Sequence, residues 1–261
     1  MKITLHGCRG SIAVSSKEFI KYGGYTSCYE LMAGNTQVIL DTGTGFQNVS
    51  LQKDFKKIIL FSHLHHDHIQ GLAFNSDIFN PSCNIVVSSA LYEPTELRSK
   101  IQTYFSGCYF PVDITTVLKN LEFQNFFSLV EDNKDNILIE SFEMNHPGRS
   151  FGYSITHDNK KFVYLSDNEF EHWQLTKLCD FCENSNFILW DGMFTDKDLI
   201  DKKGWGHSSI EQGVDFFNKI NCKKMFLTHH APERTDYDLD QISAELPEGI
   251  ELASGGMSIN I

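Results

Sequence analysis

The sequence lacks several features that define well-known protein classes. In 261 residues there is no run of about eighteen apolar residues, so no membrane-spanning helix is expected, and residues 1–7 lack the architecture of a signal peptide. We therefore expect a soluble cytoplasmic protein with no membrane partner. The seven cysteines are scattered and odd in number, which argues against a disulfide framework. Repeats, low-complexity tracts and proline-rich linkers are also absent, and we expect one domain over residues 1–261.

Basic residues are scarce as well. The chain has 22 lysines and arginines against 34 aspartates and glutamates, which gives a formal net charge of −12. Binding to a long nucleic acid depends on basic side chains that displace counterions from the phosphates. A large nucleic acid is therefore not an expected partner, and a small phosphorylated substrate fits the composition better.

Short apolar runs rich in β-branched residues recur along the chain, and helical patterns separate several of them. The sequence predicts strands at residues 2–6, 29–33, 37–41, 57–62, 84–88, 137–144, 152–156, 161–166, 186–191, 223–228 and 256–261. It predicts helices at residues 68–74, 94–105, 171–182, 209–219 and 238–246. Turn residues at 34–35 and 158–159 indicate hairpins, so the sheets should not be purely parallel. We expect an α/β (α+β) fold in which helices cover two sheets.

The run His63-Leu64-His65-His66-Asp67-His68 is the most informative segment. It places four histidines and one aspartate within six residues, directly after the predicted strand at 57–62. Imidazole nitrogens and a carboxylate oxygen, without a thiolate, suit zinc or manganese acting as a Lewis acid. The alternative is a solvated histidine-rich loop. The alternating spacing and the preceding strand favour a metal site.

Four further candidate residues stand at the ends of predicted strands or within two residues after them: Asp41, His146, Asp167 and His229. Each of them alone has a structural explanation, because a strand-end aspartate often caps a turn and a single histidine is usually hydrogen-bonded in place. In α/β folds, however, the carboxyl ends of the strands are where functional residues collect. Four residues in this same position, added to the histidine run, favour one shared site.

These motifs, in this order, resemble those of the metallo-β-lactamase superfamily over nearly the whole chain. The resemblance implies a four-layer αβ/βα sandwich of two mixed β-sheets with outer helices. It also implies two divalent metal ions per subunit, zinc in the first place and manganese as the alternative, and an Asp41 that orients one ligand. His66 should form a wall of the pocket, and His230 should point away from the metals because adjacent strand-end side chains point apart. The implied ligands are His63, His65 and His146 for one metal and Asp67, His68 and His229 for the other, with Asp167 bridging the two.

A second segment indicates which branch of the superfamily the chain resembles. Residues 204–209, read with 190–195 upstream, resemble the phosphodiesterase branch that includes RNase Z. By that resemblance His207 stabilises the phosphorane or protonates the leaving oxygen, and Asp191 holds its imidazole. The start of the helix predicted at 209–219 should add backbone donors for an anion. The alternative is that His207 is only a neighbour of that helix's N-cap.

Within that branch, residues 5–11, 22–28, 109–112 and 234–236 resemble bacterial and phage metallohydrolases related to cyclic-nucleotide phosphodiesterases. The implied reaction is hydrolysis of 3′,5′-cyclic nucleoside monophosphates by a hydroxide shared between the two metals, which Asp67 helps to orient or deprotonate. The alternatives are an RNase Z-like tRNA 3′ endonuclease, whose Gly- and Lys-rich arm is missing between residues 71 and 137, and a lactone or ester metallohydrolase. The aromatics at 104–112 allow stacking on a base or packing on a second subunit. We expect the packing, in a homodimer.

Overall fold

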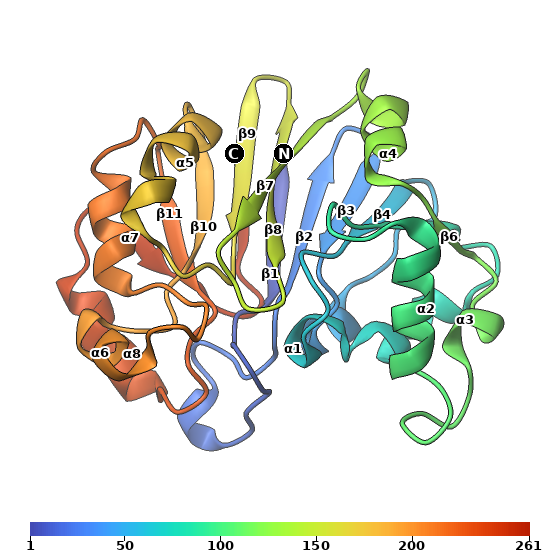
Figure 1. Ribbon diagram of the computed structural model, residues 1–261, viewed down its shortest axis with the longest axis horizontal. Coiled ribbons are helices and arrows are strands. Elements are labelled where there is room, and N and C mark those ends of the chain that lie inside the picture. The colour runs from blue at the N-terminus through green and yellow to red at the C-terminus, as the bar shows by residue number, and fades with distance from the viewer.

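Two mixed β-sheets face each other in this computed structural model, which describes residues 1–261 (Figure 1). The first sheet has the strand order β13-β1-β2-β3-β4-β5-β6, and the second has the order β12-β11-β10-β9-β8-β7. In chain order the strands are β1 (Lys2–Gly7), β2 (Cys28–Ala33), β3 (Thr36–Leu40), β4 (Lys56–Leu60), β5 (Ile85–Ser88), β6 (Leu121–Phe123), β7 (Leu138–Met144), β8 (Ser150–His157), β9 (Lys160–Leu165), β10 (Phe187–Asp191), β11 (Met225–Thr228), β12 (Ile250–Leu252) and β13 (Ser258–Asn260).

Helices cover the outer faces of both sheets, so the molecule has four layers (Figure 1). The predicted four-layer sandwich of two mixed sheets with outer helices is thereby confirmed. No helix combines the length and the apolar character that a membrane span requires. The helices are α1 (His66–Ile69), α2 (Pro94–Tyr104), α3 (Ile114–Val117), α4 (Phe126–Asn133), α5 (Leu175–Cys182), α6 (Asp196–Lys202), α7 (Ile210–Phe217) and α8 (Asp236–Glu245).

Three buried apolar clusters fill the spaces between these layers. The central cluster joins the two sheets and contains Ile3 and Leu40 from the first sheet and Tyr153 and Phe187 from the second. A second cluster lies between the first sheet and α2, and a third lies between the second sheet and α5, α7 and α8. Removal of these side chains from water, worth roughly 25 cal/mol per Å² of apolar surface, holds the layers together.

The hairpin predictions are confirmed. Strands β2 and β3 pair antiparallel, and so do β8 and β9. Their turns contain Gly34 with φ of 56°, and Asp158 and Asn159 with φ of 49° and 59°. Positive φ in the turn matches the twist of the flanking strands, and Gly, Asn and Asp tolerate it best.

All eleven predicted strands are present, but β6 and β12 were not predicted because three residues are too few to show a period-2 pattern. The helix predicted at 68–74 is divided into α1 and a 3₁₀ turn at Leu72–Phe74, because the amide of Gly71 bonds to the carbonyl of Thr42, 2.8 Å away. Of the helices that the sequence did not predict, α6 has no buried side chain and so no apolar period. α4 begins with two phenylalanines, which favour strands.

The strands that lead to the predicted ligands end at one edge of the sandwich. β3 and β4 are parallel, with Leu40 opposite Leu60. β9, β10 and β11 are parallel too, and Asp191 lies opposite Thr228. This register brings the residues that follow each strand to the same level, at the lower edge in Figure 1, where α1 lies.

Candidate dinuclear metal centre

The seven predicted metal ligands come together where the two sheets meet at this edge. The segment after β4 supplies four of them, and the segments after β7, β9 and β11 supply one each. They form two groups, and within each group the ligand atoms all lie within 4.8 Å of one another. Asp167 belongs to both groups. That these residues bind metal stays a prediction. The groups are His63, His65, His146 and Asp167, and Asp67, His68, Asp167 and His229.

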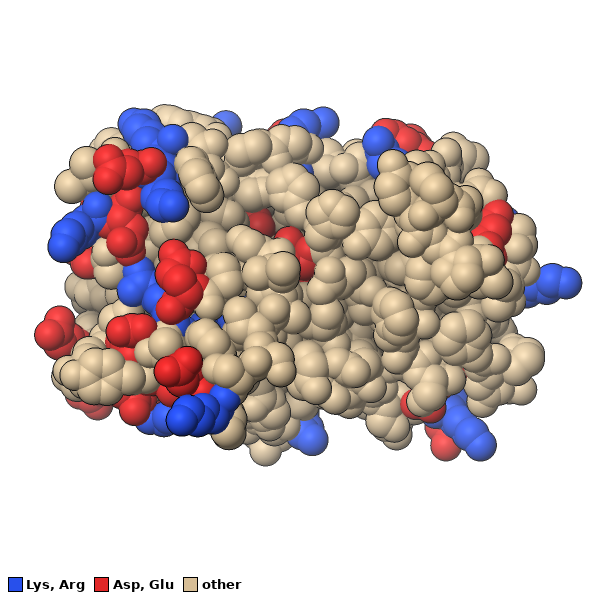
Figure 2. Space-filling model, turned by 90° about the horizontal axis from the view of Figure 1, so that it is seen from below, with Lys and Arg blue, Asp and Glu red and all other residues tan.

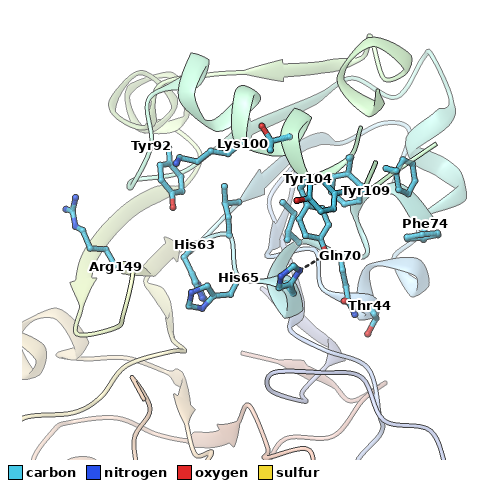
Figure 3. A pocket seen from close by; sticks show the side chains of 17 residues that line it. Thr44, His63, His65, Gln70, Phe74, Tyr92, Lys100, Tyr104, Tyr109 and Arg149 are labelled. Atoms are coloured by element: carbon cyan, nitrogen blue, oxygen red, sulfur yellow. Dashed lines mark hydrogen bonds between the residues drawn. The ribbon is translucent and has the colours of Figure 1, made fainter. Parts of the chain in front are cut away.

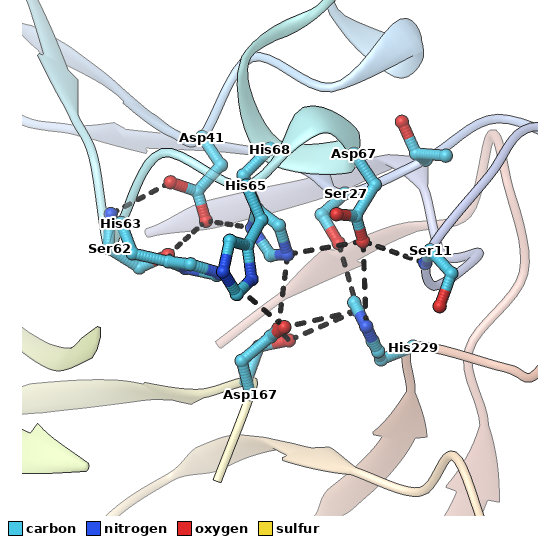
Figure 4. A network of polar contacts seen from close by, with 12 residues as sticks. Ser11, Ser27, Asp41, Ser62, His63, His65, Asp67, His68, Asp167 and His229 are labelled. Carbon is cyan, nitrogen blue, oxygen red and sulfur yellow. Dashed lines mark hydrogen bonds and ion pairs between the residues drawn. The ribbon is translucent and has the colours of Figure 1, made fainter. Parts of the chain in front are cut away.

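Three residues of the site have a left-handed backbone. The φ angles of Asp41, Asp167 and His229 are 59°, 57° and 59°, and each residue stands one or two positions after the end of a strand. Such a conformation costs a non-glycine residue about 1–3 kcal/mol and persists where the surroundings fix it. The turn takes each side chain out of its sheet and into the contact network drawn in Figure 4.

Asp41 organises the first-sheet side of the site from a fully buried position. Its carboxylate accepts hydrogen bonds from the amide and the hydroxyl of Ser62 at 2.8 and 2.7 Å, and from the Tyr164 hydroxyl at 2.8 Å. Nδ1 of His68 donates to the same carboxylate at 2.8 Å (Figure 4). This bond fixes the orientation of the His68 ring and points Nε2 into the site, where it can serve as a ligand atom. The contact is the one expected of Asp41.

Two other imidazoles are oriented in the same way. Nδ1 of His63 donates to the hydroxyl of Ser62 at 3.0 Å, and that hydroxyl in turn donates to Asp41. Nδ1 of His146 donates to the carbonyl oxygen of Gly206 at 2.8 Å. In both residues the second nitrogen, Nε2, is left as the ligand atom.

The residues fit two divalent metal ions. Nε2 of His63, of His68 and of His229 is buried and has no hydrogen-bond partner. A buried polar atom without a partner costs about 1–3 kcal/mol, so three in one cluster call for a ligand. The donor set of imidazole nitrogens and carboxylate oxygens, without thiolate, is one that zinc and manganese accept.

The electrostatics of the cluster agree with this fit. Burial opposes the charge of Asp167, but His229, His68 and His63 hold the pKa of its carboxyl well below the usual range. Burial and the charge of His68 lower the pKa of His63, so its imidazole is neutral and has a free lone pair. The pKa of His68 is raised by the carboxylates of Asp167, Asp67 and Asp41, against the effect of burial. Anionic carboxylates gathered around it show that the cluster favours added positive charge.

His207 lies beside the two ligand groups and belongs to neither. Its ring stacks on that of His229, with centroids 5.0 Å apart, and Nδ1 donates to Asp191 at 2.9 Å. Burial opposes protonation, but the carboxylate of Asp191 raises the pKa of His207 to about 9. Asp191 is itself held by the amides of Asn168 and Met193, at 3.1 and 3.2 Å. The structure therefore brings together the pair that the sequence singled out.

The start of α7 offers fewer free backbone donors to an anion than expected. Ser209 and Gln212 form a reciprocal capping box. The amide of Gln212 bonds to the Ser209 hydroxyl and that of Ile210 to the carbonyl of Phe194, at 3.0 and 2.8 Å. The bond to Asp191 makes His207 more than a neighbour of the N-cap, and anion binding by the start of α7 stays a prediction.

A cavity of about 1060 Å³ opens beside the first ligand group, with His63 and His65 in its wall. His66 lines it too, as predicted, and its Nδ1 lies 3.0 Å from the Tyr104 hydroxyl. His230 is buried and bonds through Nε2 to the carbonyl of Ala253 at 2.8 Å, away from the ligand groups as expected.

The sequence did not identify the residues that hold the ligands in place. Ser11 donates its amide to Asp67 at 2.8 Å, and Ser27 lies 3.2 Å from Nδ1 of His229. Glu169 accepts from the amides of Gly204 and Gly206 at 2.8 and 3.0 Å. The sequence gave a weak indication for Ser11 and Ser27, because both lie in the segments (5–11 and 22–28) that resemble metallohydrolases related to cyclic-nucleotide phosphodiesterases. Nothing in the sequence indicated a role for Glu169.

Comparisons with known proteins agree with this site and fold. Residues 36–230 match the family model described as the beta-lactamase superfamily domain. A ribonuclease Z of Natronomonas pharaonis is 26% identical over 170 residues, which are 62% of this chain and 49% of that protein, so the chain matches about half of its length. A diphosphatase of the PhnP family has the same fold, with a TM-score of 0.70 at 16% identity and coverage of 100% of this chain and 97% of the other. The short form of human tRNase Z gives 0.68 at 19% identity, with coverage of 100% and 99%.

Proposed function

The chain belongs to the β-lactamase superfamily, and from that premise we propose that it is a metal-dependent phosphodiesterase that opens 3′,5′-cyclic nucleoside monophosphates. The observation that carries the proposal is the position of His207. It is an imidazole at the ligand cluster that is oriented by a carboxylate and left out of both ligand groups. An ester or lactone hydrolase would have no need of it.

The two groups of ligands would hold two divalent ions, most simply zinc, with Asp167 between them. Bound there, the ions would supply Lewis acidity toward a phosphoryl oxygen and would activate water. Asp67 is placed to orient that water, because its carboxylate is anchored by the amide of Ser11 and lies 3.6 Å from Nε2 of His229. Metal binding and water orientation account for attack on phosphorus.

His207 then serves the leaving oxygen. The bond from Nδ1 to Asp191 fixes the ring and stabilises its protonated form, so Nε2 carries a proton that it can donate. Nε2 makes no hydrogen bond within the protein, which leaves the proton free for the departing ribose oxygen. Stacking on His229 keeps the donor beside the ligand cluster.

The surface supports a small substrate. Figure 2 shows the molecule from below, the side on which α1 lies in Figure 1, and few basic side chains surround its central hollow. The chain as a whole has a net charge of −12, which is poorly suited to binding a polyanion. A cyclic mononucleotide brings a single negative charge and fits within the cavity of about 1060 Å³.

A tRNA 3′ endonuclease is the second candidate. The 26% identity to a ribonuclease Z favours it, although the match covers only 49% of that protein. A hydrolysis screen of the zinc- and manganese-loaded protein against cyclic mononucleotides, cyclic dinucleotides and a tRNA precursor distinguishes the candidates. If the protein cleaved only the tRNA precursor, the cyclic-nucleotide substrate would be wrong, but the assignment as a phosphodiesterase would still hold.

The role of His207 is tested with two leaving groups. His207→Ala should lower kcat on the cyclic nucleotide roughly 10²–10⁴-fold. It should lower kcat on bis-p-nitrophenyl phosphate much less, because p-nitrophenolate departs as an anion without a proton. The matched control is His172→Ala, an exposed histidine in the turn before α5. Bound metal, measured by elemental analysis, should be unchanged in both variants, and an equal loss on both substrates would remove His207 as the proton donor.

A further inference from the structure

The cavity beside the ligand groups has two chemically different ends (Figure 3). His63 and His65 lie between them. On one side are Tyr104 and Tyr109, and on the other side Lys100 and Arg149. A substrate whose phosphate reaches the ligand groups must therefore extend over one of these ends or both.

Aromatic rings from three segments form the first end. Phe74 and Tyr109 are 64% and 76% exposed, although both line the cavity. Phe110 joins them, with its ring centroid 6.0 Å from that of Phe74. Tyr104 is held in place by its bond to Nδ1 of His66. Large aromatic rings left open to water beside a metal site indicate a surface that a flat apolar ligand covers.

One polar side chain among these rings has no partner. The side-chain amide of Gln70 lines the cavity and makes no hydrogen bond within the protein, whereas the backbone amide of this residue donates to the carbonyl of His66. By contrast, the side-chain amide of Gln37 donates to the carbonyl of Ser50, and that of Gln174 donates to Asn168. An amide that can both donate and accept is suited to the edge of a nucleobase.

The charge of the lining points to the same class of ligand. The chain has 34 acidic residues, yet none of the 17 residues that line the cavity is an aspartate or a glutamate. The formal charges there are those of Lys100 and Arg149. An anionic ligand is therefore not repelled from the cavity, whereas a cationic ligand gains no carboxylate partner.

We propose that this aromatic end is the base-binding subsite, where Phe74 and Tyr109 stack on the nucleobase and Gln70 reads its edge. The inference rests on the proposed function, because a base is present only if the substrate is a nucleotide. Stacking tolerates every base, since every base has an aromatic face, while the amide of Gln70 sets a preference among bases.

Base binding can be measured apart from phosphate binding by comparing two ligands that differ only in the base. Calorimetric titration of the metal-loaded protein with adenosine 5′-monophosphate and with ribose 5-phosphate gives a Kd for each, the second ligand lacking the base. Tyr109→Ala should raise the Kd of the nucleotide, and the KM of the cyclic nucleotide, on the order of tenfold. The Kd of ribose 5-phosphate should stay the same. Tyr237→Ala, a tyrosine on α8 that is 71% exposed and lies outside the cavity, should change none of these values.

Gln70→Ala should change the ratio of kcat/KM between cyclic AMP and cyclic UMP, whereas Gln241→Ala on α8 should not. If the wild-type protein cleaves a cyclic nucleotide but both cavity variants leave Kd, KM and base preference unchanged, the subsite is wrong and the function stands. If it binds neither ligand and cleaves no nucleotide, the function fails and the subsite with it. A dimer that dissociates in Tyr109→Ala, with KM unchanged, would assign the rings to a second copy instead.

Discussion

The buried carboxylate of Asp41 controls two imidazoles at once. It accepts directly from Nδ1 of His68, and it reaches His63 through the hydroxyl of Ser62. Each ring is therefore held by the nitrogen that faces away from the centre, and its other nitrogen faces inward as a ligand atom. One acidic residue that need not touch a metal thus prepares one ligand from each of the two groups.

Asp41→Asn should weaken metal binding. An amide at this position can offer its NH₂ group to the N–H of His68, which removes the acceptor that fixes the ring. Loss of such an orienting partner lowers metal affinity about 10–100-fold. Competition with a chromophoric chelator measures the affinity, and Asp215→Asn, an exposed residue of α7, is the control. An affinity for zinc equal to that of the wild type would show that Asp41 has no orienting role.

At the scale of elements, the turn before α7 joins two parts of the site. Glu169 accepts from the amides of Gly204 and Gly206, and the carbonyl of Gly206 accepts from His146. His207 comes next in the chain. The position of one predicted ligand and that of the predicted proton donor therefore both depend on this turn.

Two glycines of the turn allow a matched test. Gly206 and Gly204 have φ of +88° and +86°, so an alanine at either position should cost roughly 1–2 kcal/mol of folding stability. A Cβ at Gly206 would lie 2.3 Å from Nδ1 of His146, whereas nothing lies within 4 Å of a Cβ at Gly204. We expect Gly206→Ala to lose metal and activity, and therefore to melt at a lower temperature than Gly204→Ala, which should keep both. Equal metal contents in the two variants would contradict this account.

The sequence predicts the elements and the ligands that depend on short patterns. Strand-end positions such as Asp167 and His229 are visible because an apolar run ends in a polar residue. Contacts between distant segments leave no such trace, and neither the clamp of Glu169 on Gly206 nor the free amide of Gln70 could be predicted. The helix α6 escaped prediction for a related reason, because all of its side chains are at least partly exposed to water.

At the scale of the whole molecule, the ligand cluster joins the two sheets. The segment after β4 belongs to the first sheet, whereas His146, Asp167 and His229 follow strands of the second. Positive charge placed between them would tie the sheets together at one edge, in addition to the apolar core that they share. Metal binding should therefore stabilise the entire fold.

Removal of metal should lower the melting temperature. At free metal about 1,000-fold above Kd, the bound state gains roughly 4 kcal/mol, which for a chain of this size corresponds to a shift on the order of 10 °C. Differential scanning calorimetry with and without a chelator measures this shift. His63→Ala should lose most of it, and the control His172→Ala should retain it. A melting temperature indifferent to the chelator would mean that the cluster does not bind metal in the native state.

The homodimer stays a prediction. Sedimentation velocity at micromolar concentration should give twice the chain mass of 29.8 kDa. A single species at 29.8 kDa would show that the expected homodimer is wrong. It would also exclude packing on a second subunit as the role of the exposed aromatic rings beside the cavity.

The order of the ligands along the chain has a consequence for biosynthesis. His63 is the first of the seven and His229 the last, and they lie on opposite sheets. A ribosome must therefore release most of the described chain before the ligand set exists. The complete set of ligands therefore forms only after both sheets have been synthesised and have packed together. A nascent fragment that ends before His229 lacks one ligand and can bind an ion only at an incomplete centre.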